Sequence, residues 1–122
     1  MKTIEHKYKP LNLKIIIYLD PKDFANCEYK PFGEIPDNYW ENYAGISDGT
    51  CVAFISKKDK CLCLFKEKDC SDKEILETIA HELGHLKPKL SLFLDEENKA
   101  NAYEIFVKQV YEIFYIINSY KL

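Results

Sequence analysis

The residues from Ser71 to Leu86, which read SDKEILETIAHELGHL, carry the clearest helical pattern in this sequence. Ser71 followed three residues later by Glu74 is a capping box, which is a sequence signature of a helix N-terminus. Apolar side chains then recur every three or four residues, as they do along one face of a helix. These side chains are Ile75, Leu76, Ile79, Leu83 and Leu86. Because Lys87 and Pro88 end the pattern, we expect a helix that stops there and buries one face against a core.

Three predicted strands precede this helix. Residues 50–56 (TCVAFIS) and 60–66 (KCLCLFK) are apolar and flank the polar turn Lys57-Lys58-Asp59, which predicts a β-hairpin. Residues 11–19 (LNLKIIIYL) predict a further strand. Between these strands, residues 21–36 are rich in proline and are expected to be mostly loop. Residues 37–44 (DNYWENYA) are expected to form a short helix.

A second, longer helix is expected from Asp95, a suitable N-cap, to about Ser119. Its predicted apolar seam consists of Ala100, Tyr103, Val107, Val110, Phe114 and Ile117. Strands followed by helices are typical of an α+β domain, and 122 residues correspond to one domain. We therefore expect residues 1–122 to form a single small α+β domain, with an antiparallel or mixed sheet, a hairpin and two helices.

The composition is that of a folded globular chain and gives no sign of a nucleic-acid-binding surface. Apolar residues make up 47% of the chain, charged residues 30%, and the formal net charge is −3. All 17 basic residues are lysine, so no guanidinium group can hold a phosphate or carboxylate bidentately. The apolar runs are far shorter than the ~20 residues that a membrane span needs, and the N-terminal segment has no signal-peptide pattern. We therefore expect a cytoplasmic protein without direct contact to nucleic acid or membrane.

The five cysteines are expected to be reduced thiols, because their number is odd and no CxxC pair is present. Cys61 and Cys63 are two residues apart on a predicted strand, so their side chains share one face. We interpret the pair as small apolar residues of a core. A thiolate metal site would need a second pair of ligands.

Within the first predicted helix, His81-Glu82-Leu83-Gly84-His85 form the pattern HExxH. Since an α-helix has 3.6 residues per turn, His81 and His85 lie on one face, one turn apart. Both imidazoles can then reach a single Zn²⁺ ion at about 2.0–2.1 Å. Glu82 reaches a water at the metal more easily than the metal itself, which is the arrangement of a metalloprotease with a glutamate general base. The alternative interpretation is a polar helix face that binds no metal.

A catalytic zinc site normally has three protein ligands, and the remaining histidine, His6, lies in a lysine-rich N-terminal segment that we expect to fray. We therefore expect a carboxylate at the start of the second helix to be the third ligand. The candidates are Asp95, Glu96, Glu97 and Glu104. We favour Glu97, because Asn101 follows one turn later and can accept the free N–H of a ligand histidine. Glu104 is the alternative, but Lys108 follows it by one turn and would compete for its carboxylate.

Residues 79–85 (IAHELGH) and 97–103 (ENKANAY) together resemble the ImmA/IrrE family of zinc metallopeptidases, whose members show HExxH followed by E-x-x-A-N-x-[F/Y] on the next helix. The resemblance implies a gluzincin-like, and so zincin-like, core with Glu82 as the base. The zinc ligands that it implies are His81, His85 and Glu97. It also implies a protein or peptide substrate, since known members cleave transcriptional repressors of mobile elements or stress responses.

Two functions from different classes are consistent with these motifs. The first is a zinc-dependent peptidase whose substrate lies extended beside an edge strand, either residues 50–56 or residues 60–66. The second is a binding module that keeps the zinc fold and sequesters a partner protein without cleaving it. A purely structural zinc ion is less consistent with the motif, because structural sites usually have four protein ligands.

Overall fold

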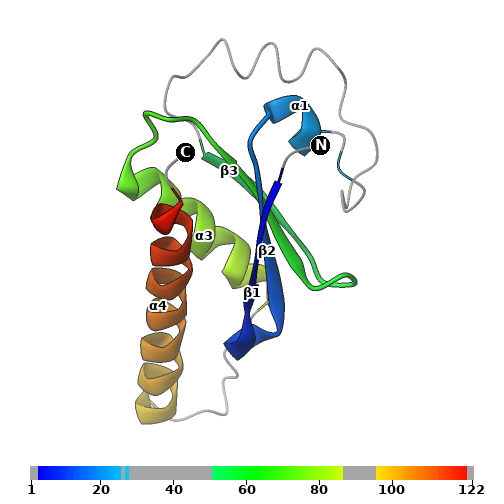
Figure 1. Cartoon of the computed structure of the whole chain (residues 1–122). Coiled ribbons are helices and arrows are strands. Elements are labelled where there is room, and N and C mark those ends of the chain that lie inside the picture. The colour runs from blue at the N-terminus through cyan, green and yellow to red at the C-terminus, as the bar shows by residue number, and fades with distance from the viewer. Residues whose placement is uncertain (1–2, 26, 28–50, 87–95, 121–122) are drawn as a thin grey trace.

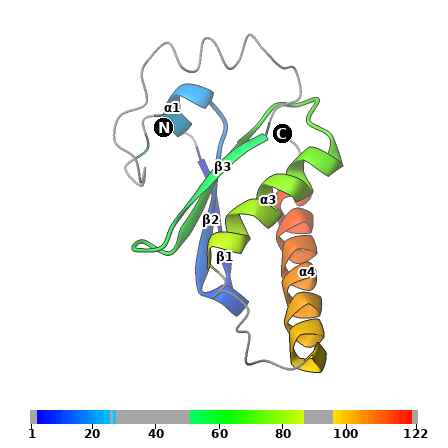
Figure 2. The ribbon, with the colours of Figure 1, turned by 180° about the vertical axis from the view of Figure 1, so that it is seen from behind.

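The structure is a computed structural model and describes residues 3–25, 27, 51–86 and 96–120. A four-stranded sheet with helices on both faces forms its centre (Figures 1 and 2). The strands are β1 (Thr3–Tyr8), β2 (Leu13–Tyr18), β3 (Cys51–Ser56) and β4 (Cys61–Lys66), in the sheet order β1-β2-β4-β3. The two central strands are parallel, and each outer strand runs antiparallel to its neighbour. The predicted α+β class with a mixed sheet is therefore confirmed; the short helix expected at 37–44 lies outside the described residues.

The predicted hairpin is confirmed as β3 and β4, paired from Cys51↔Lys66 to Ser56↔Cys61. Its turn is closed by Ser56, whose hydroxyl donates to the Asp59 carboxylate at 3.0 Å and accepts the Asp59 backbone N–H at 3.2 Å. Lys60 completes the turn with a left-handed φ of 51°. Because β4 also pairs with β2, β3 is the hairpin strand that lies at an edge of the described sheet, and β1 forms the other edge. Of the two edge strands considered from the sequence, 50–56 is correct and 60–66 is wrong.

The N-terminal segment that was expected to fray is the strand β1, which pairs with β2 over its whole length. It also forms two polar pairs, one with the C-terminal half of α4 (Glu96–Ser119) and one with Tyr120, the residue that follows α4. The Nδ1 atom of His6 lies 3.2 Å from the hydroxyl of Tyr120, and the Tyr8 hydroxyl donates a hydrogen bond to the Glu112 carboxylate. These pairs involve residues more than 100 positions apart, which is why local sequence patterns did not predict the strand.

The main core lies between the sheet and the two long helices, α3 (Asp72–Leu86) and α4. The backbone N–H of Glu74 donates to Ser71 Oγ at 3.2 Å, so the predicted N-cap of α3 is confirmed. The apolar stripe of α3 is buried through Ile75, Ile79 and Leu83. The most completely buried side chains of this core are Leu13, Ile15, Ile17, Leu62, Leu64, Ile75, Ile79, Leu83, Ile113 and Ile117.

The opposite face of the sheet is covered by a short helix, α1 (Pro21–Ala25), within the segment expected to be mostly loop. Proline suits the first turn of a helix because it needs no hydrogen-bonded N–H there. The residues of this second core are Ile16, Tyr18, Phe24, Cys27, Cys61, Cys63 and Phe65. The Sγ atoms of Cys61 and Cys63 lie 3.9 Å apart and both residues are buried, which confirms that they share one apolar face. All five cysteines are free thiols.

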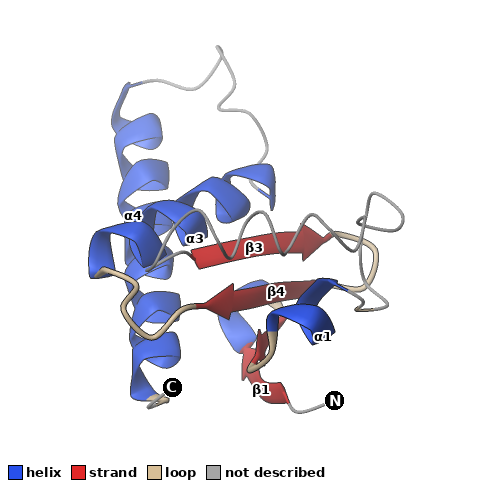
Figure 3. Ribbon diagram, turned by 90° about the horizontal axis from the view of Figure 1, so that it is seen from above, coloured by secondary structure: helices blue, strands red, loops and turns tan. Residues whose placement is uncertain are grey.

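The apolar seam predicted along α4 is confirmed only for the second half of the helix. Val110, Phe114 and Ile117 are buried, whereas Tyr103 and Val107 are about half exposed. The physical reason is length: α4 has 24 residues and α3 has 15, and the first half of α4 extends beyond α3 (Figures 1 and 3). In that half Phe106 is partly buried against the main core, whereas Tyr103, Ile105 and Val107 stay exposed.

Candidate metal centre

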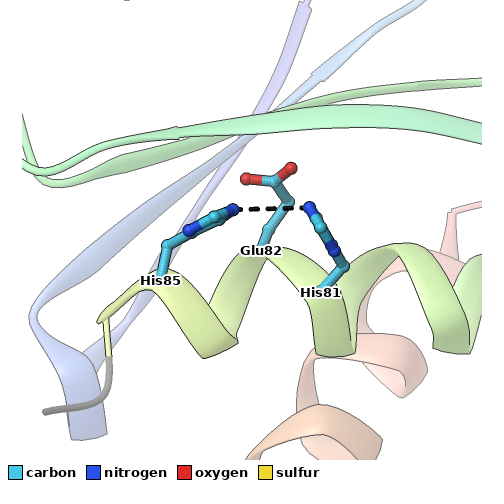
Figure 4. A group of neighbouring side chains, drawn as sticks. All are labelled: His81, Glu82 and His85. Carbon is cyan, nitrogen blue, oxygen red and sulfur yellow. Dashed lines mark hydrogen bonds between the residues drawn. The ribbon is translucent and has the colours of Figure 1, made fainter. Parts of the chain in front are cut away.

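The helix α3 presents His81, Glu82 and His85 on a different face from its buried stripe (Figure 4). Both histidines are exposed, and Glu82 is half-buried. Because the buried residues Ile79 and Leu83 fix the rotation of α3 about its axis, the direction of the two imidazoles is determined by the packing of the core. Each side chain also points towards the β3 edge of the sheet rather than towards α4 (Figure 4).

The two imidazoles converge through the same ring atom. Their Nε2 atoms lie 3.3 Å apart, and the rings are nearly perpendicular, with centroids 4.9 Å apart and an interplanar angle of 87°. Two nitrogens bound to one tetrahedral Zn²⁺ at 2.0–2.1 Å would be separated by about 3.3–3.4 Å. The observed separation therefore fits two ligands of a single ion.

Glu82 completes a group of three possible ligand atoms that all lie within 4.8 Å of one another. Burial raises the pKa of the Glu82 carboxyl, while the two imidazoles and a backbone hydrogen bond from Ile55 oppose the rise. Ile55 belongs to β3, so the carboxylate lies directly beside the backbone of the edge strand. The sequence analysis did not identify this contact with Ile55. The only sequence signal for it was the prediction of a strand that could form an edge.

The structure does not bring the predicted third ligand into this group. Glu97 lies in the first turn of α4 and Glu104 two turns further on, and both side chains are exposed. Neither joins the group formed by His81, Glu82 and His85 among the described residues. The first turn of α4 and the last turn of α3 lie well apart in the views of Figures 1 and 3. Asn101 is also exposed, and Asp95 lies outside the described residues, so the third ligand stays a prediction.

The donor set allows the group to hold a metal ion. Imidazole nitrogen with carboxylate oxygen suits zinc and other first-row divalent metals, whereas calcium and magnesium prefer oxygen ligands alone. The other histidine of the chain, His6, lies in β1 next to Tyr120 and is not part of the group. Because both histidines are exposed, an ion held between them would be accessible to solvent.

Comparisons of the chain with protein-family models, with curated proteins and with solved structures gave no match. None of the described helices is both long enough and apolar enough to cross a bilayer.

Proposed function

We propose that this protein is a zinc-dependent metallopeptidase with a zincin-like arrangement of its sheet and the HExxH helix. The observation that carries the proposal is the 3.3 Å separation of the His81 and His85 Nε2 atoms, with the Glu82 carboxylate beside them. Paired histidines on a surface helix occur without a metal, but such pairs do not need a half-buried glutamate on the same edge. The combination is typical of a metal ion with a general base next to it.

The proposed chemistry divides between the metal and Glu82. When bound, zinc supplies a Lewis acid that polarises the scissile carbonyl and makes an attacking water more acidic. The Glu82 carboxylate takes the proton from that water and passes it to the leaving amine. Burial raises the pKa of the Glu82 carboxyl, and a carboxylate that holds a proton more readily is a stronger base. His81 and His85 hold and orient the ion.

The proposed substrate is a protein or peptide bound as an extended strand along β3. Among the described strands, β3 pairs only with β4. On its other side the Thr78 hydroxyl donates to the Cys51 carbonyl and the Ile55 backbone donates to Glu82, and the proposed substrate strand would use the remaining backbone groups. Ile55 on β3 is in contact with Glu82, which places a strand bound there within reach of the base. The resemblance to the ImmA/IrrE family makes a regulatory protein, such as a transcriptional repressor, the substrate class to test first.

The proposed third ligand is Glu97, with Glu104 as the alternative carboxylate. Since neither is close to the two histidines in the structure, binding by Glu97 requires the first turn of α4 to approach α3. Coupling of this kind is common, because metal binding supplies free energy for ordering the ligands. Glu97→Gln should weaken zinc binding at least tenfold and Glu104→Gln should leave it unchanged. The reverse result would assign Glu104.

The proposal is tested with Glu82→Gln in a cleavage assay on a mixed-sequence fluorogenic peptide library and on repressor proteins, in the presence of Zn²⁺. The variant should bind zinc as wild type does and lose cleavage by at least 100-fold. Glu77→Gln, an exposed glutamate on the same helix, is the matched control and should retain full activity. If Glu82→Gln cleaves as fast as wild type, Glu82 is not the base. If zinc-loaded wild type cleaves nothing, a partner-binding module is the better interpretation.

A further inference from the structure

The exposed side of α4 carries a continuous line of large apolar side chains. Tyr103, Val107, Tyr111 and Tyr115 follow one another at intervals of four residues and are 58%, 49%, 46% and 65% exposed. We call these four residues the tyrosine ridge. Side chains four apart form a ridge along a helix surface, and such ridges are the elements by which helices pack together. The rings of Tyr111 and Tyr115 are already in contact, with centroids 6.5 Å apart.

The ridge begins in the part of α4 that the rest of the described chain supports least, with Tyr103 and Val107, and continues along the supported part with Tyr111 and Tyr115. From Glu97 to Gln109 no described residue of α4 is fully buried, whereas Val110, Ile113, Phe114 and Ile117 are. A helical segment of this length is marginal in water without tertiary packing. Soluble proteins rarely leave a continuous line of large apolar side chains uncovered.

We propose that the tyrosine ridge is the contact surface between two copies of this chain, which cross through their α4 helices in an antiparallel, two-fold symmetric pair. At ~200 Å² for a full aromatic side chain, the ridge exposes roughly 400 Å² of apolar surface. With the stems of the flanking charged side chains, two copies would bury about 1,000 Å², which is near the lower limit for a specific interface. The dimer is therefore weak and depends on protein concentration.

The arrangement of side chains on α4 favours a second copy of the same helix as the occupant. A two-fold axis at Val107 brings that valine against its symmetry mate and Tyr103 against Tyr111 of the other copy, so these three residues are complementary to themselves. Tyr115 then lies opposite Lys99 of the other copy. On the flank of the ridge, Glu104 lies three residues before the axis and Lys108 one residue after it. In the antiparallel pair, Glu104 of one copy and Lys108 of the other lie two residues apart, about 3 Å along the helix axis. Two reciprocal ion pairs therefore form between the copies.

This charge pattern is unused within one copy. Glu104 and Lys108 are both exposed, and neither takes part in the ion pairs formed among the described residues. The ridge is also separate from the metal centre, since the His81 and His85 side chains point away from α4 towards β3 (Figure 4). The inference therefore does not depend on the proposed peptidase activity.

Sedimentation equilibrium of the whole chain with a chelator present tests the proposal without any contribution from metal. The apparent mass of wild type should rise from 14.3 kDa towards twice that value as its concentration increases to about 500 µM, the range expected for a small interface. Val107→Glu, which places two carboxylates at the axis, should remain monomeric. Ile105→Glu is the matched control: Ile105 is 53% exposed but lies on the opposite flank of α4, so its variant should dimerise as wild type does.

Charge reversal makes the test specific for the antiparallel pair. Glu104→Lys and Lys108→Glu should each weaken the dimer at least fivefold, and the double variant should restore it. A wild-type chain that stays monomeric, or a dimer that survives Val107→Glu, would overturn the proposal. A monomeric Val107→Glu variant with a strongly lowered unfolding temperature in circular dichroism would also overturn the proposal, because the tyrosine ridge would then be covered by the chain's own residues.

Discussion

Replacing Gly84 with alanine should stabilise the protein, although this glycine lies inside the HExxH pattern. Gly84 is exposed within α3, and a Cβ added there would find no other atom within 4 Å. Glycine costs about 1 kcal/mol relative to alanine in a helix interior, so Gly84→Ala should raise the free energy of unfolding by about that amount. At a urea dependence of about 1.5 kcal/mol per M, the unfolding midpoint should increase by about 0.7 M. The melting temperature should increase by about 4 °C.

Urea titrations followed by circular dichroism at 222 nm measure this change, and Gly84→Val provides the control. Valine has a lower helix propensity than alanine but needs more space, so in an empty surrounding the stability should follow the order alanine, valine, glycine. A loss of stability in either variant would refute the reasoning, because it would show that other parts of the chain occupy the space beside Gly84.

Three further predictions concern single side chains. In metal-free protein, burial raises the pKa of the Glu82 carboxyl above its unfolded value, so wild type loses stability as the pH rises above about 4, and Glu82→Gln should become more stable relative to it. Urea titrations with chelator at several pH values measure the difference in the free energy of unfolding, and a difference that does not change with pH would contradict the prediction. A thiol reagent at pH 8 should modify the half-buried Cys70 before Cys51, because burial raises the pKa of the Cys51 thiol to about 12. Mass spectrometry measures the order of modification, and modification of Cys51 first would show that its site opens readily. Tyr8→Phe should lower the free energy of unfolding by about 1 kcal/mol in a urea titration, because it removes the hydrogen bond to Glu112; unchanged stability would mean that this bond contributes nothing.

The elements that the sequence predicted well are those with strong local signals. The N-cap at Ser71, the apolar stripe of α3 and the hairpin turn at Ser56 and Asp59 each involve residues a few positions apart. Their side chains contact the backbone or one another within the same element or turn. For the same reason, the convergence of His81 and His85 could be predicted from their spacing alone.

The elements that the sequence did not predict depend on distant contacts. The strand β1 is held by the apolar β2 and by α4, and neither contact is visible in its own mostly polar residues. The apolar pattern of α4 gave the correct helix but the wrong extent of burial, since α3 is too short to cover it. The contact between Glu82 and Ile55 requires the relative placement of a helix and a strand, which periodicity does not contain.

Zinc titration of metal-free protein, followed by isothermal calorimetry and by elemental analysis after dialysis, tests the metal centre most directly. Wild type should bind one zinc ion per chain, and His81→Ala and His85→Ala should each lose at least 100-fold in affinity. His6→Ala, which removes the histidine outside the site, should bind as wild type does. Wild-type protein that binds no zinc, or a His85→Ala variant that binds it equally well, would show that the two imidazoles of α3 do not form a metal site.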